Sequence, residues 1–158
     1  MPSLDLPLAD GPHLDVFEAI VARLKGWSDL RRVVRVWRVW DGDPNDAAPW
    51  SIGMCPGLRL TPSFGEVGNL DPAQIQSELA VGIEIATAGT NLRNPSKIWR
   101  AIKLCLSDPT WRYSLTAKGA YPHLIDFGPL RPGVEKDSPG LVISRGVFSI
   151  TCIETTSM

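Results

Sequence analysis

The fold is indicated most directly by ELAVGIEIAT (Glu78–Thr87), which is followed closely by NPSKIWRAIKLCL (Asn94–Leu106). In the first stretch, large apolar residues alternate with small or acidic ones, which is typical of a β-strand with one buried face. In the second, apolar residues recur at helical spacing, and Asn94 with Pro95 supplies a capping residue and a first-turn proline. The pair predicts a half-buried strand and an amphipathic helix joined by a short turn.

A second amphipathic helix is predicted near the start of the chain. Apolar residues from Phe17 to Trp27 fall on one face, and Gly26 is expected to cap the C-terminal end. Two further stretches, Arg31–Trp40 and Leu141–Ile153, are rich in β-branched and aromatic residues and predict strands. The predicted order is therefore helix, strands, helix and a long closing strand.

The segments between these elements are less regular. Trp50–Cys55 and Gly57–Phe64 predict either two short strands or one strand bent at Pro56. Gly65–Ala73 predicts a loop, and Trp111–Leu115 predicts a short strand. Their assignments depend on composition alone, because none of them carries a long periodic pattern.

The elements together predict an α+β fold, in which two amphipathic helices pack on one face of a mostly antiparallel sheet with long loops. A chain of 158 residues with 44% hydrophobic and 21% charged residues has the size and composition of one domain. We expect residues 1–158 to form that domain, with an extended arm at 1–12 and a long loop at 116–139.

The charge balance and the cysteines narrow the classes of function. Sixteen basic and seventeen acidic residues give a formal net charge of -1, which argues against a dedicated nucleic-acid-binding protein. Cys55, Cys105 and Cys152 are widely spaced, so we expect buried free thiols and a reducing compartment. With no apolar run of membrane-spanning length and an acidic N-terminal stretch, we expect no membrane segment and no signal peptide.

The sequence contains no recognisable reaction centre. Neither His13 nor His123 has acidic or cysteine neighbours at metal-ligand spacing, and a triad drawn from His123, Asp126 and a serine is expected by chance. The loop Asp41–Asp46 begins like a calcium loop but lacks its glycine and its final glutamate. We predict that the protein is not an enzyme and has no catalytic residue, metal ion or cofactor.

Two groups of residues are candidates for contact with a partner. Trp37, Trp40 and Trp50 flank a polar loop, which suits a subunit interface. The densest basic cluster has two interpretations: a solvated strand edge that discourages pairing, or a surface aimed at an acidic partner or at DNA passing nearby. The residues of this candidate basic surface are Arg31, Arg32, Arg35 and Arg38.

The order of elements resembles that of the tail terminator and tail completion proteins of tailed bacteriophages. The resemblance rests on VFEAIVARLKG (Val16–Gly26), on Ser77–Leu106 with its strand, turn and helix, and on GLVISRGVFSITCIE (Gly140–Glu154). It implies a structural α+β subunit that forms a hexameric ring on the tail tube, stops tube polymerisation and joins the head-side connector or stopper protein. Family members have no catalytic residues.

The resemblance also implies a setting and a set of contacts. The homo-oligomer would contact the tail tube protein and the connector, DNA would only pass through its lumen, and the subunit would be assembled in the host cytoplasm into the virion. The contact elements would be 41–50 and the long loop 116–139. The candidate interface residues are then Trp37, Trp40, Trp50, Tyr121, Phe127, Leu130 and Arg131.

Other classes of protein remain open at this level. A non-catalytic cytoplasmic α+β binding module is the second hypothesis, and another minor tail or neck protein is a variant of the first. A small hydrolase that uses His123 is a distant third.

Overall fold

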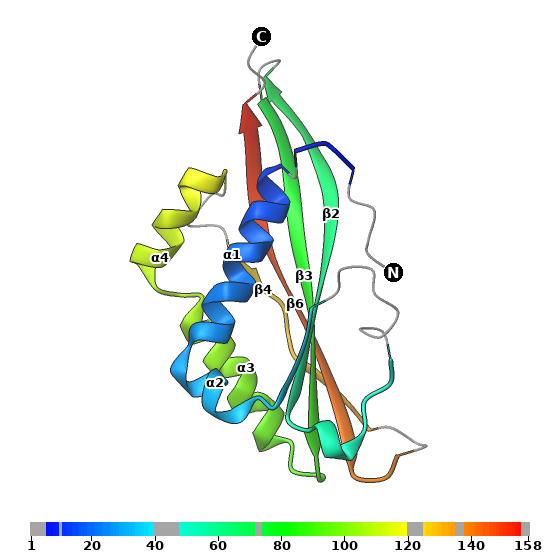
Figure 1. The fold of residues 1–158 in the computed structure, drawn as a ribbon. Helices are drawn as coiled ribbons and strands as arrows, with labels where there is room; N and C mark the ends of the chain where they lie inside the picture. Colours follow the sequence, from blue (N-terminus) through cyan, green and yellow to red (C-terminus); the bar gives the residue numbers. More distant parts are fainter. Residues whose placement is uncertain are drawn as a thin grey trace.

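The computed structural model describes residues 6–9, 11–39, 48–71, 74–119, 125–134 and 138–155, with the backbone alone for 66–71 and 155. Within these ranges the chain forms one mixed, mostly antiparallel sheet with its α-helices on one side (Figure 1). This arrangement confirms the predicted α+β class.

Three long strands form the body of the sheet. β2 (Gly57–Asp71), β3 (Gln74–Ala88) and β6 (Leu141–Thr155) each span 15 residues, and β3 pairs antiparallel with both of its neighbours. Along 15 residues a strand extends for about 50 Å, so this part of the molecule is elongated.

Shorter strands complete both sides of this body. β1 (Val36–Val39) pairs in parallel with β2, and it makes the sheet mixed. β4 (Asp126–Phe127) and β5 (Arg131–Val134) pair antiparallel with different parts of β6. The strand order is β1-β2-β3-β6-β4, with β5 also paired to β6.

The helices form a layer against one face of the sheet, here called the inner face (Figure 1). α1 (Pro12–Gly26) and α3 (Arg93–Cys105) are the long ones, and the short helices α2 (Ser28–Val33) and α4 (Pro109–Ser114) follow them. Both predicted helices are confirmed. The α1 helix includes Gly26, so the residue at its C-terminal boundary is Trp27 and not the expected glycine.

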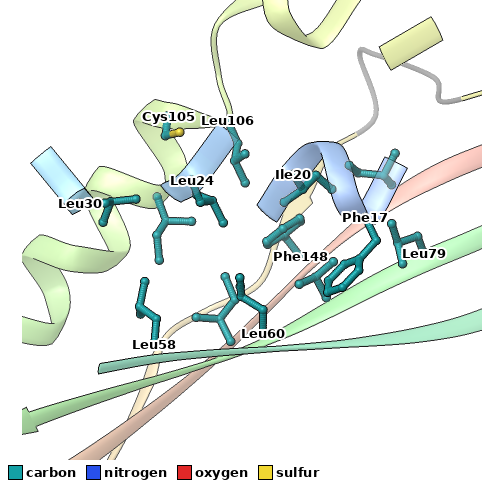
Figure 2. Close-up of a cluster of buried hydrophobic side chains, with 14 of the residues drawn as sticks. Phe17, Ile20, Leu24, Leu30, Leu58, Leu60, Leu79, Cys105, Leu106 and Phe148 are labelled. Carbon is teal, nitrogen blue, oxygen red and sulfur yellow. The ribbon is translucent and has the colours of Figure 1, made fainter. Parts of the chain in front are cut away.

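The main core lies between this helical layer and the sheet, as Figure 2 shows. Alternate residues of β3 from Leu79 to Ile85 are fully buried, which is the face predicted from the alternation. They share one cluster with Ile20 and Leu24 of α1 and with Phe148 of β6. Each such side chain contributes about 1.5–3 kcal/mol when fully buried, so this layer accounts for much of the stability.

The prediction of a strand over Arg31–Trp40 is wrong in its first half. Residues 31–33 belong to α2, and the strand begins only at Val36. The Trp27 carbonyl accepts the Arg31 N–H at 2.8 Å, and the buried Leu30 anchors the short helix in the core. Arg31 and Arg32 are themselves good helix formers, so the strand signal comes only from the β-branched and aromatic residues that begin at Val33.

Three shorter assignments are also wrong. The predicted loop Gly65–Ala73 is largely strand, because β2 continues to Asp71 through two irregularities in its pairing with β3. Trp50–Cys55 contains a 3-10 turn at Ile52–Met54 and no strand. Trp111–Leu115 lies mostly in α4, where the Asp108 carboxylate accepts the Thr110 N–H and caps the helix.

The long loop predicted at 116–139 is partly regular in the described residues. A 3-10 turn at Leu115–Lys118 opens the segment, and β4 and β5 then lie along β6. Strands this short carry no recognisable periodicity, and they form because β6 offers them a partner.

Candidate interaction site

The face of the sheet opposite the helices, here called the outer face, carries small and polar residues along most of its length. Thr61 and Ser63 of β2 are exposed, and they lie in register with Gly82 and Ala80 of β3. In the part of the chain that the structure describes, the α-helices all lie on the inner face (Figure 1). Trp50 and Cys55 cover one end of this face, where they bury Ala86 and Ile143, and among the described residues the stretch around Thr61 and Ser63 is accessible to another molecule.

A row of charged side chains crosses this outer face. Arg38 of β1 is in register with Arg59 of β2, which is in register with Glu84 of β3. Glu84 is in register with Arg145 of β6, which is in register with Arg131 of β5. Directly opposed residues share a face and lie within side-chain reach, so the five form one continuous arginine row with a single carboxylate.

Glu84 is the central acceptor of the arginine row. Its carboxylate accepts hydrogen bonds from an Arg59 guanidinium nitrogen, from Trp50 Nε1 at 3.2 Å and from Arg145 Nε at 3.3 Å. The Arg59 side chain is only 12% exposed, whereas that of Arg145 is 59% exposed. The Arg59–Glu84 pair is therefore structural, whereas more than half of the Arg145 side chain remains in solvent.

Trp50 covers one end of the arginine row. The guanidinium groups of Arg38 and Arg59 lie over its ring, at 4.5 and 5.1 Å from the ring centroid. Both arginines also donate to the Ala48 carbonyl. Below the ring is Gly57, where any Cβ would overlap Trp50. Trp50 was predicted as an interface residue, but only 7% of it is exposed and its own chain buries the rest.

The two ends of the arginine row differ in what they can bind. Arg38 and Arg59 are held by Trp50, Ala48 and Glu84, whereas Arg145 and Arg131 are exposed and adjacent across β5 and β6. Two neighbouring guanidinium groups suit a carboxylate or phosphate, because arginine forms charge-assisted and often bidentate hydrogen bonds. Arg131, which the resemblance selected, thus lies beside an arginine that sequence reasoning missed.

The other candidate interface residues lie elsewhere. Trp37 points to the inner face and is half-buried against the main core. Phe127 contacts Trp99 at 6.2 Å and Phe148 at 5.7 Å between ring centroids, and Leu130 is also half-buried against that core. Their own chain therefore covers part of these apolar groups. Trp40 and Tyr121 fall outside the described residues.

The candidate basic surface is divided by the fold. Arg31 and Arg32 are exposed on α2, and Arg32 pairs with Asp29 at 3.4 Å. Arg35 is exposed between α2 and β1, while Arg38 belongs to the arginine row on the outer face. The strand-edge interpretation fails for Arg31 and Arg32, because they lie on a helix.

The three cysteines are free and buried, as predicted. Burial raises the pKa of Cys105 to about 11, although nearby Arg23 opposes the shift, and burial raises the pKa of Cys152 to about 11. Burial also raises the pKa of Cys55. A nucleophilic cysteine needs its thiolate form, so these thiols are poorly suited to react at neutral pH.

The remaining chemical candidates find little support in the described ranges. His13 packs against Phe64 at 4.7 Å, and its Nδ1 lies 3.4 Å from Ser77 Oγ. His123 and the calcium-like loop Asp41–Asp46 lie outside those ranges. Among the residues described, no group of three or more His, Cys, Asp or Glu could hold a metal ion. Nor does the described chain contain a helix long and apolar enough to cross a membrane.

No protein-family model matches this chain, and no curated protein matches its sequence.

Proposed function

We propose that this protein is a structural virion subunit that closes into a hexameric ring, caps the tail tube of a tailed bacteriophage and joins it to the head-side connector. The observation that carries the proposal is the open outer face of a sheet whose helices all lie, in the described chain, on the other side. Such a face can be covered by a neighbouring copy.

The outer face has the properties that close packing between copies requires. Gly82 and Ala80 have small side chains, so another surface can approach the backbone at the centre of this face. Val147 beside Gly82 is apolar and 50% exposed. The exposed Arg145 and Arg131 at one end provide directional contacts for acidic groups. When the contacting patches of two copies are different, repeated contacts close into a ring if the rotation between copies allows it.

The test is to measure the mass by light scattering across concentrations and to examine each fraction by negative-stain microscopy. The proposal predicts closed rings with a mass near six times 17.3 kDa. Rings of another stoichiometry would correct the number of subunits. A monomer that also fails to assemble on purified tail tubes would overturn the proposal.

A variant of the outer face makes the test specific. Gly82→Arg places a long cation at the centre of this surface, and the fold has room for it because a Cβ there meets only the Thr61 carbonyl oxygen at 3.6 Å. We expect Gly82→Arg to prevent ring formation. Ala22→Arg is the matched control, since Ala22 is exposed on α1, outside the sheet and outside the expected contact segments, and receives the same cation. Equal assembly of both variants would exclude the outer face as the interface.

A binding module is the second candidate, and one observation favours it. A cavity of about 560 Å³ opens between α2, α3 and the end of β3. This candidate predicts a stable monomer whose melting temperature rises with a ligand that binds the folded state.

A further inference from the structure

The cavity between α2 and α3, here called the α2–α3 pocket, is lined mainly by apolar side chains. Val33 is 40% exposed and Leu104 is 49% exposed, so a substantial apolar surface faces solvent. Covering exposed apolar surface of this kind with a partner removes it from water, which stabilises the complex. The apolar lining residues that α2 and α3 contribute are Leu30, Val33, Ile98, Ala101 and Leu104.

A buried hydroxyl group lies in the lining of the same pocket. Thr87 of β3 is only 3% exposed, and its Oγ1 has no hydrogen-bond partner among the described residues. A buried polar group without a partner is unfavourable, so an occupant that supplies a donor or an acceptor is favoured. A polypeptide supplies both along its backbone, whereas a hydrocarbon chain supplies neither.

The rim of the α2–α3 pocket is basic. Lys97 and Arg100 of α3 and Arg32 of α2 are exposed at the rim. Arg32 forms an ion pair with Asp29, which also lines the pocket, at 3.4 Å. Three cations and one carboxylate leave a formal charge of +2. The pocket therefore suits a segment that is apolar in the middle and acidic at its flanks.

The N-terminal arm of this same chain has that composition. Its sequence, MPSLDLPLAD (Met1–Asp10), places Asp5 and Asp10 on either side of Leu6 and Leu8. In the described part of the arm, Leu6 is 74% exposed and Leu8 is 75% exposed, so neither leucine is buried by its own chain. The arm and the pocket complement each other in both polarity and charge.

The arm cannot reach the pocket of its own chain. His13 at the start of α1 lies beside Ser77 of β3, whereas the pocket lies at Thr87. Ten residues separate these points on β3, which is about 33 Å along the strand. Leu6 is only six residues from Pro12, and that length of chain spans at most about 21 Å. An α2–α3 pocket within reach of the arm would therefore be that of another copy.

We propose that the N-terminal arm of one copy inserts Leu6 and Leu8 into the α2–α3 pocket of the next copy, with Asp5 and Asp10 facing Lys97 and Arg100. The contact joins two different patches of the chain, so it links copies head to tail. For its place in the virion it rests on the proposed ring. The contact itself can form in an assembly of any size.

A labelled peptide tests the contact directly. The probe is a fluorescent peptide with the sequence of residues 1–11, and the acceptor is the full chain carrying Leu6→Ser and Leu8→Ser, so that its own arms do not compete. We expect saturable binding in fluorescence anisotropy. A peptide with the same two serine substitutions should not bind. Absence of binding by the natural peptide would overturn the proposal.

Charge reversal of the rim tests where the peptide binds. Adding Lys97→Glu and Arg100→Glu to the acceptor should weaken peptide binding by at least about tenfold, equivalent to 1.4 kcal/mol. The matched control carries Lys103→Glu and Lys118→Glu, which make the same charge change away from the pocket. Equal weakening in both acceptors would show non-specific attraction and overturn the assignment of the pocket.

A charge swap completes the test. A peptide with Asp5→Lys and Asp10→Lys should bind the charge-reversed acceptor better than the natural peptide does. The outcome is independent of the ring. Peptide binding without rings would refute the hexamer and leave the arm contact supported. Ring formation without peptide binding would support the hexamer and refute the arm contact.

Discussion

Trp50 Nε1 donates a hydrogen bond to Glu84 Oε2 at 3.2 Å, and this contact joins the segment before β2 to the centre of the sheet. The tryptophan lies over Gly57, and the glutamate is the only acid in a row that contains four arginines. An aromatic residue chosen from the sequence as a partner contact thus serves first to organise the chain's own arginines. A partner that binds the outer face would therefore contact arginine side chains that the protein already holds in place.

Removing the charge of Glu84 should destabilise the fold. In Glu84→Gln the Arg59 guanidinium, with only 12% of its side chain exposed, loses its counter-charge. We expect a loss of about 1–3 kcal/mol in the free energy of unfolding, measured by urea denaturation. Glu78→Gln is the matched control, because Glu78 is exposed on the same face of β3 and should change stability little. Equal losses would mean that the negative charge of Glu84 adds nothing specific to stability.

A methyl group at Gly146 should be costly. A Cβ at this position of β6 would lie 2.8 Å from the ring of Trp99, a buried residue of α3. Gly146→Ala should therefore destabilise the protein by about 1–3 kcal/mol through overpacking. Gly65→Ala in β2 is the control, since nothing lies within 4 Å of its Cβ position. Thermal unfolding followed by circular dichroism measures both, and a neutral Gly146→Ala would show that Trp99 can move.

The buried thiols should make stability depend on pH at alkaline values. The pKa of Cys105 and Cys152 rises from 9.0 to about 11 in the folded chain. The unfolded chain then releases these protons first, so their contribution is fully present below pH 9 and is lost progressively as pH approaches about 11. The measurement is urea unfolding between pH 8 and 11. The double variant Cys105→Ala with Cys152→Ala should show a shallower decline than the natural chain, and an equal slope would contradict the assignment.

The two amphipathic helices and the strand Glu78–Thr87 could be predicted because their periodicity is local. Phe17, Ile20 and Leu24 follow the helical period and are all buried, and Leu79 to Ile85 follow the strand period. The short helix at Ser28–Val33 was not predicted, because the β-branched and aromatic run that follows it extended the predicted strand back over Arg31 and Arg32, which are good helix formers. Strand extension over Gly65–Asp71 likewise depends on pairing with β3, which lies later in the chain.

Less of the candidate site than of the fold could be predicted from the sequence. In the sequence nothing distinguishes Glu84 from Glu78, the other acidic residue of its strand, and no pattern links it to Arg59 or Arg145. These residues belong to three strands, and a shift of one residue in either pairing would send the partners to opposite faces.

The sequence by itself determined which residues are buried in the long helices and in β3, because hydrophobic periodicity records the face that meets the core. It also determined that the cysteines are buried and free. Only the tertiary structure decided that five strands align Arg38, Arg59, Glu84, Arg145 and Arg131 in one row. It likewise decided that α2 and α3 enclose a pocket beyond the reach of their own arm. Register and helix packing arise from contacts between distant segments, and a local pattern does not encode them.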